Sequence, residues 1–153
     1  MQVNARVDYA LRAVVQIASA GTDGGVTTKR ELSTSQHIPA RFLENILLQL
    51  VRSGILIATR GSQGGYSLGR PAAEISVADV VRAIDGPLAG VRGAPPEQID
   101  YPETSRSVQA IWIALRASMR TVLEGTSVEA LVTGDLPDVA EELLGRPGAW
   151  ERR

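Results

Sequence analysis

Apolar residues recur at three- and four-residue intervals through the first fifty positions, which is the spacing of helical faces. The first run spans 5–19 and consists of Val7, Ala10, Leu11, Val14, Val15 and Ala18. A second run lies between Pro39 and Gly54 and consists of Phe42, Leu43, Ile46, Leu47, Leu50 and Val51. Pro39 suits the first position of a helix, where the N–H that it lacks would be unpaired, and Gly54 suits the position after the end. The pattern predicts one helix over 5–19 and a strongly amphipathic one from Pro39.

Two capping boxes predict the starts of further helices. In such a box a Ser or Thr hydroxyl accepts from the backbone N–H three residues on, and a Glu at that position reaches back. Thr28 and Glu31 have this spacing and predict a short helix over 28–35. Thr126 and Glu129 have it again and predict a short helix of sequence SVEALV.

A β-hairpin and a fourth helix are predicted after Gly54. The run ILIATR at 55–60 and the run GYSLG at 65–69 indicate two short strands, and the glycines between them permit a tight loop. Ser76 is placed to cap a helix of sequence VADVVRAI, which Gly86 and Pro87 would end.

The longest predicted helix spans 104–124, after a loop over 87–103 that is rich in Pro, Gly and acids. At 1.5 Å per residue this helix is about 30 Å long. A stripe along it is too long for a small domain to cover from one side, so we expect it to join two copies of the chain. The predicted dimerisation residues are Val108, Ile111, Trp112, Leu115, Met119 and Val122. One or two further helical turns are expected at 138–144.

Charge is divided unevenly along the chain. Of 16 Lys and Arg and 17 Asp and Glu, residues 1–70 hold eight and four, a net charge of +4. Residues 71–153 hold the other eight and 13, a net charge of −5. This asymmetry favours contact of the N-terminal half with a polyanion.

The composition excludes several classes of chemistry. The chain has no cysteine, which removes disulfides, thiolate catalysis and cysteine-ligated metals. His37 is the only histidine, and no G-x-S-x-G elbow or cofactor motif accompanies it, so we expect no enzyme activity, no metal and no cofactor. No apolar run is long enough to span a membrane and no secretory signal is evident, so a cytoplasmic location is expected.

The order helix, capped helix, turn, helix, Gly-looped hairpin is that of a winged helix-turn-helix. The N-terminal half of the third helix would enter the major groove, where Arg reads guanine, Glu accepts from cytosine and Asn pairs with adenine. The tip of the hairpin suits a phosphate or a narrow minor groove. The predicted DNA-binding residues are Thr28, Arg41, Glu44, Asn45, Arg52, Arg60, Gly61, Ser62 and Gln63.

The run IPARFLENILLQLVRSGILIATRGSQGGYSLGRPAAEISVADVVRAIDGPL resembles the IscR/NsrR/CymR (Rrf-two) family of bacterial winged-helix regulators. The resemblance rests on F-L-E in the third helix, L-x-x-x-G-I-L before the wing and R-G-x-x-G-G-Y-x-L-x-R through it. D-Y-A-L-R-A-V near the start and S-V-E-A-L-V extend it over residues 1–133. It implies a dimer, joined by the long helix, that binds a partly palindromic operator through the recognition helix and the wing arginine.

The resemblance also exposes a departure. Cluster-bearing members place three cysteines in the loop before the long helix and at its start, whereas the matching stretch here has none. Gly93 and Arg106 stand near two of those places, and Gln109 stands near one where some members use His. Asp8 matches an acidic residue that completes the cluster in one branch. The chain is therefore similar to the family but is expected to lack the iron–sulfur cluster.

These observations predict a mostly helical fold with a small hairpin: a winged helix-turn-helix over 1–86, a loop over 87–103, dimerisation helices over 104–133 and a tail over 134–153. The expected function is a homodimeric transcription regulator, a repressor, that binds double-stranded DNA. Control by a docked partner protein or by a small-molecule effector near 87–103 stays open. Glu97, Asp100, Tyr101 and Glu103 in that loop are expected to be solvated, although a ligand or cation site is the alternative.

Overall fold

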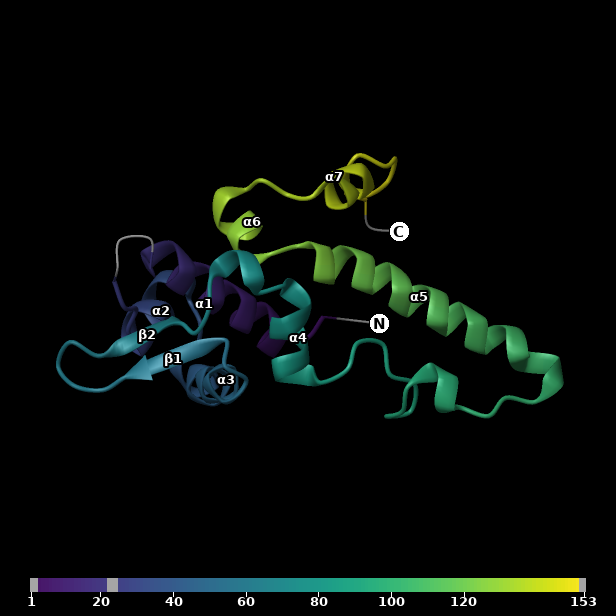
Figure 1. The fold of residues 1–153 in the computed structure, drawn as a ribbon, viewed down its shortest axis with the longest axis horizontal. Helices are drawn as coiled ribbons and strands as arrows, with labels where there is room; N and C mark the ends of the chain where they lie inside the picture. The colour runs from purple at the N-terminus through teal and green to yellow at the C-terminus, as the bar shows by residue number, and fades with distance from the viewer. Residues whose placement is uncertain (1–2, 22–24, 152–153) are drawn as a thin grey trace.

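The computed structural model describes residues 3–21 and 25–151, and the first half of the chain is a winged helix-turn-helix (Figure 1). Its elements are α1 (Ala5–Gly21), α2 (Lys29–Gln36), α3 (Ala40–Arg52), β1 (Leu56–Thr59) and β2 (Gly65–Leu68). The two strands are antiparallel, with Leu56 opposite Leu68 and Thr59 opposite Gly65. Pro39 is the N-cap of α3 and not its first helical residue, because its ψ of 128° is extended. The predicted fold class is confirmed.

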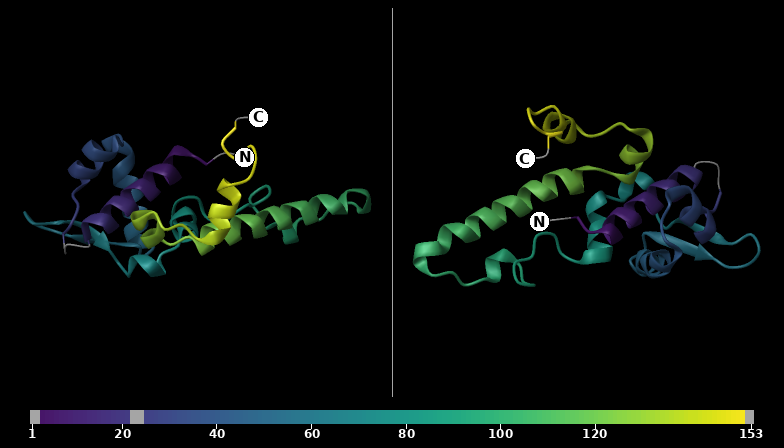
Figure 2. Two further views of the ribbon diagram at one scale, coloured as in Figure 1. Left: turned by 90° about the horizontal axis from the view of Figure 1, so that it is seen from above. Right: turned by 180° about the vertical axis from the view of Figure 1, so that it is seen from behind.

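In the second half of the chain one long helix projects from the winged helix, and shorter helices precede and follow it (Figures 1 and 2). These elements are α4 (Val77–Asp85), α5 (Arg106–Gly125), α6 (Val128–Thr133) and α7 (Asp138–Leu144). The segment 87–103, predicted as a loop, contains a 3₁₀ turn at Pro96–Gln98. A second 3₁₀ turn at Glu103–Ser105 precedes α5, which begins at Arg106 and not at residue 104. Among the described residues, no helix combines the length and apolarity needed to cross a membrane.

Helix α1 lies at the centre of the core and packs against α3, α4, α6 and β2. Its small side chains Ala10, Ala13 and Val14 are fully buried, which lets these elements approach closely. The predicted apolar face of α3 meets α1 there, and four of its residues have no exposed surface: Leu43, Ile46, Leu47 and Leu50. Burial of this face fixes which side of α3 remains in solvent.

Capping boxes open α2 and α4. Thr28 accepts from the Glu31 backbone, and the Glu31 carboxylate accepts from the Thr28 backbone, as predicted. Ser76 caps α4 as predicted and forms the same reciprocal pair with Asp79. Partial burial alone would raise the pKa of Asp79, but hydrogen bonds from Ser76 and from Arg70 outweigh it, so the pKa lies below its ordinary value.

The predicted capping box at Thr126 is wrong. Ser127 is the N-cap of α6, and its hydroxyl accepts from the Ala130 backbone at 3.0 Å. The Thr126 hydroxyl instead donates to the Val122 carbonyl at 2.8 Å, within the last turn of α5. Thr126 and Ser127 are adjacent and both carry a hydroxyl group. The Thr126 hydroxyl bonds to the end of α5, which leaves Ser127 to cap α6.

The chain returns to the winged helix immediately after α5. Val77 donates to the Thr126 carbonyl at 2.9 Å and Val128 donates to the Ile75 carbonyl at 2.8 Å, so α4 and α6 begin side by side. Val128 is fully buried in the same core as α1. Helix α6, which the sequence groups with the long helix, therefore packs into the winged-helix core.

We expect Ser76→Ala to lower the free energy of unfolding by about 1 kcal/mol, because it removes the N-cap of α4. Urea unfolding of the variant beside wild type measures this, with Ser62→Ala on the exposed wing as a matched control. Equal unfolding midpoints for Ser76→Ala and wild type would contradict the assigned role.

Candidate nucleic-acid interface

The solvent face of α3 carries a stripe of five exposed side chains: Arg41, Glu44, Asn45, Leu48 and Arg52. These residues recur every three to four positions, about one helical turn, so they lie on one side of the helix, opposite the face buried in the core. The structure thus brings the four residues predicted on this helix together in one stripe about 16 Å long.

The first two turns of this stripe are held by neighbouring side chains. The Arg41 guanidinium lies over the Phe42 ring, 4.9 Å from its centroid, and Phe42 packs at 5.9 Å against Tyr9 of α1. The Glu44 carboxylate lies 3.9 Å from the Lys29 ammonium at the start of α2. Because Glu44 is 81% exposed, this ion pair is weak and leaves the carboxylate able to accept other hydrogen bonds.

Thr28 positions α2, since both of its donors serve the capping box. Its backbone N–H and its hydroxyl donate to the Glu31 carboxylate at 2.7 and 2.8 Å. These two hydrogen bonds, that of the backbone first, lower the pKa of Glu31. A contact of Thr28 with DNA stays a prediction, and its hydroxyl is already engaged within the chain.

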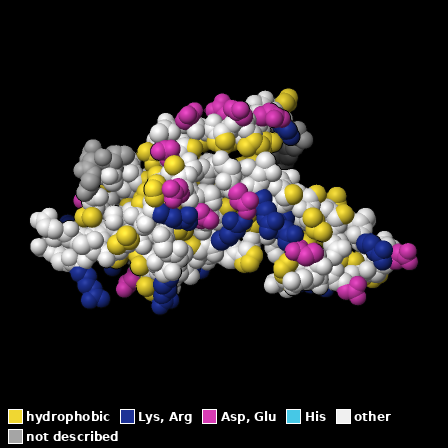
Figure 3. All heavy atoms as spheres, viewed as in Figure 1, with side chains coloured by type: hydrophobic (Ala, Val, Ile, Leu, Met, Phe, Trp, Pro, Cys, Tyr) yellow, Lys and Arg dark blue, Asp and Glu magenta, His cyan; other side chains and the backbone are white. Residues whose placement is uncertain are grey.

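The wing exposes the predicted residues Arg60, Gly61, Ser62 and Gln63 at the turn of the hairpin. Gly61 has φ +105°, which a side chain would strain. The hairpin is fastened to the residue before Thr28, because Thr27 and Tyr66 exchange backbone hydrogen bonds of 3.0 and 2.9 Å. Lys and Arg side chains project from the lower edge of this half in Figure 3, whereas Asp and Glu gather over α7.

Helix α5 has no buried residue over its twenty positions. At its N-terminal end Val108, Ile111 and Trp112 are 39, 63 and 38% exposed. Towards the C-terminal end Met119 lines a groove against α1 and α4, and Leu115 and Val122 are half-buried. The predicted dimerisation stripe is therefore partly covered within the chain and most open at its N-terminal end.

The loop 87–103 is fastened to α5 by polar contacts. The Gln109 amide donates to the carbonyls of Pro96 and Ile99, both at 3.0 Å. The Glu97 carboxylate forms an ion pair with Arg116 at 2.7 Å, and this hydrogen bond lowers the pKa of Glu97. Gln109 thus holds the loop in place, near a position where some family members carry a cluster ligand.

Comparisons with known proteins agree with this architecture. Residues 3–134 match the model of the Rrf2 family, described as iron-dependent transcriptional regulator. The chain is 43% identical over 143 residues to "Putative HTH-type transcriptional regulator Rv1287" of Mycobacterium tuberculosis, covering 94% of this chain and 88% of that protein. The solved structure of CymR, the global cysteine regulator of B. subtilis, has a TM-score of 0.75 at 22% identity, over 88% of this chain and 98% of that one. T. potens IscR has a TM-score of 0.71 at 22% identity, over 88% of both chains.

This chain belongs to the Rrf2 family. As an Rrf2 protein it is a winged-helix DNA-binding regulator of transcription, and the resemblance drawn from its sequence is confirmed. The two solved structures each support the likeness of fold over 88% of this chain.

The donor set of this Rrf2 protein does not fit an iron–sulfur cluster. The sequence has no cysteine, and within 3–21 and 25–151 no three His, Asp or Glu side chains converge as metal ligands. Asp8, the acidic residue of the cluster-bearing resemblance, pairs instead with Arg12 one turn along α1 at 3.3 Å. The description of the family as iron-dependent therefore finds no matching ligands here.

Two further residues lie at the candidate interface that the sequence pattern did not predict. Leu48 is 48% exposed between Asn45 and Arg52, and a helical projection that places it with Arg41 would have found it. An apolar side chain in this place suits contact with a thymine methyl group. Lys29 faces Glu44 only because α2 packs on α3, and no local pattern signals that pairing.

Gly64→Ala is expected to disorder the wing while the helical core stays folded. A Cβ at this position would lie 2.3 Å from the Thr59 carbonyl oxygen, closer than side chains tolerate. Overpacking of this kind costs about 1–3 kcal/mol. Faster amide hydrogen exchange over 56–68, with α1 unchanged, measures the effect, and Ser62→Ala is the control. Wild-type protection of β1 and β2 would refute this.

Proposed function

We propose that this Rrf2 regulator acts as a homodimeric repressor that reads a partly palindromic operator and needs no iron–sulfur cluster. In this proposal α3 enters the major groove and the wing tip follows the minor groove or the backbone. The exposed stripe of α3 is the main support for the proposal. It places two cations, a carboxylate, an amide and an apolar group along one face of a helix, where each can reach the major groove. We expect it to act in the bacterial cytoplasm.

Residue roles follow from chemistry and position. Arg41, Glu44 and Asn45 in the first two turns of α3 are assigned to bases, and Leu48 to a thymine methyl group. Arg52, at the C-terminal end, is assigned to phosphate. The wing residues Arg60, Gly61, Ser62 and Gln63 are assigned to the minor groove and backbone.

Dimerisation through α5 is supported by its open apolar surface. Ile111 and Trp112 expose apolar area at the end that projects furthest from the winged helix (Figure 1). Burying this surface against a second copy removes it from water and places two recognition helices for two half-sites. For such dimers the half-sites lie about one helical turn apart, near 34–36 Å.

A docked partner protein is the second candidate for control. Trp150 is 81% exposed beyond α7, and Asp and Glu gather over this helix (Figure 3). Trp150 donates to the Leu144 carbonyl at the end of this helix, so an exposed apolar side chain lies next to an acidic helix, which suits a basic partner. Deletion of residues 135–153 would abolish that control and leave operator binding intact.

Arg41→Ala and Arg60→Ala separate base contacts from backbone contacts. After selection of an operator with wild-type protein, Arg41→Ala should cost about 1–3 kcal/mol on it and relax preference at one position per half-site. Arg60→Ala should weaken operator and scrambled duplex alike and lower the salt slope by about one for each phosphate that is no longer neutralised. In a dimer each substitution is present in both subunits, so the loss of binding free energy and the change in salt slope roughly double per complex.

Arg146→Ala, just after α7, is the matched control for both variants, because its side chain is exposed and pairs only with Glu142 in the described part of the chain. Fluorescence anisotropy across a salt series measures all four proteins. Unchanged affinity in both Arg41→Ala and Arg60→Ala would exclude the proposed mode of DNA binding.

Ile111→Asp is expected to convert the dimer to a monomer, because it would bury a charge in the apolar interface. Sedimentation at micromolar concentration measures this. Ile57→Asp is the matched control, since Ile57 on the wing is 52% exposed and Ile111 is 63% exposed. A monomeric wild type, or a dimeric Ile111→Asp, would show that α5 does not join the subunits.

A further inference from the structure

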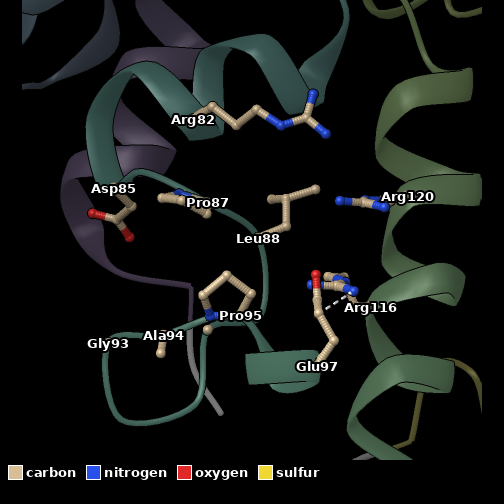
Figure 4. Close-up of a pocket in the computed structure, with 11 residues that line it drawn as sticks. Arg82, Asp85, Pro87, Leu88, Gly93, Ala94, Pro95, Glu97, Arg116 and Arg120 are labelled. Carbon is tan, nitrogen blue, oxygen red and sulfur yellow. Dashed lines mark ion pairs between the residues drawn. The ribbon is translucent and has the colours of Figure 1, made fainter. Parts of the chain in front are cut away.

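Three arginines meet at one cavity between α4, α5 and the loop 87–103 (Figure 4). Arg82 comes from α4, and Arg116 and Arg120 come from successive turns of α5. The cavity has a volume of about 520 Å³, within the range of small-molecule sites. Apolar side chains also line it: Pro87, Leu88 and Pro95.

The acids near these arginines are fewer than the arginines. Glu97 pairs with Arg116 at 2.7 Å, and Glu124 pairs with both Arg82 and Arg120, the latter at 3.9 Å. Asp85 also lines the cavity, but Figure 4 shows its carboxylate turned away from the guanidinium groups, and it accepts from Asn4. Three guanidinium groups therefore share two carboxylates. Dark-blue side chains gather between α4 and α5 in Figure 3.

Arg116 and its partner differ in exposure. The Arg116 side chain is 13% exposed, so its charge requires an anion nearby. Glu97, in contrast, is 52% exposed and comes from a short 3₁₀ turn of the loop. Both Arg116 and Arg120 act on the Glu97 carboxylate and lower its pKa, the hydrogen bond from Arg116 most of all. The position of that carboxylate is thus a place where an anion is favoured.

We infer that this cavity binds a small organic or inorganic anion, through a carboxylate or phosphate group that replaces Glu97 on Arg116 and Arg120. Arginine forks bind either group through paired hydrogen bonds, and the apolar lining accommodates a carbon skeleton. Neither the family description nor the composition of the loop assigns such a site.

The consequence for DNA binding rests on the proposed function. Glu97 holds the loop 87–103 on α5, so an anion on Arg116 would release this anchor while the Gln109 hydrogen bonds to the loop stay in place. Arg82 connects the same cavity to α4, and α4 packs against α3. Occupancy can therefore bias the angle between α5 and the recognition helix, which sets the distance between half-sites in a dimer.

Calorimetric titration of the full chain without DNA tests the site, with citrate and pyrophosphate as probes at constant ionic strength. At least one probe should bind with a dissociation constant below about 1 mM. Arg120→Gln and Arg116→Gln should weaken it about tenfold or more, and Arg146→Gln, just after α7, should leave it unchanged. Glu97→Gln should tighten binding several-fold, because it removes the competing carboxylate. Arg120 is half exposed, so its variant tests the site even if Arg116→Gln fails to fold.

The outcomes separate the site from its ligand and from DNA binding. Binding of citrate, of pyrophosphate or of both that is abolished in Arg120→Gln would support the site and identify the anionic group. Heat from neither probe, an equal weakening in Arg146→Gln, or weaker binding to Glu97→Gln would overturn the inference. Operator binding is measured apart, so anion binding without any operator binding would count against the proposed function alone.

Discussion

The arrangement of this protein depends on two backbone hydrogen bonds that bring the chain back to the winged helix. They join Val77 to Thr126 and Val128 to Ile75, and they set the starts of α4 and α6 side by side. The segment between Gly86 and Thr126 therefore leaves the winged-helix core and returns to it, and both of its ends are fixed to that core. Because both ends of this segment are fixed, α5 can project into solvent and stay folded. A change in its position would also act on α4, which it contacts.

The orientation of α3, the proposed recognition helix, is set by the side chains that it buries. The fully buried side chains of α3 are all aliphatic and pack on α1, whose alanines permit close contact, so rotation of α3 would open cavities in the core. The exposed stripe is thereby held rigidly, although its own contacts, such as the ion pair of Glu44 with Lys29, are weak. In the proposed mode of DNA binding, specificity can thus vary at Arg41, Glu44 and Asn45 without a change in the fold.

Sequence pattern predicted the helices, the hairpin and the exposed stripe because these follow from local periodicity. It failed where two local solutions compete, as at Thr126 and Ser127, which both suit a cap. It also could not divide the α5 stripe, since only tertiary packing decides that Met119 faces α1 and α4 while Ile111 faces solvent. The meeting of Arg82 with Arg120 was equally out of reach, because the two are distant in sequence.

The loop 87–103 shows how a family fold persists when its usual ligands are absent. The family resemblance implies cysteines in this loop for members that carry a cluster, whereas here Gln109 and the pair of Glu97 with Arg116 fasten it to α5. These contacts differ from metal–thiolate bonds in reversibility, because a half-exposed carboxylate such as that of Glu97 can be displaced by a competing anion. In the proposed anion site, such a loop would respond to the concentration of charged solutes. The polar contacts of Gln109, Glu97 and Arg116 therefore fix the loop on α5 through groups that a soluble anion can compete with.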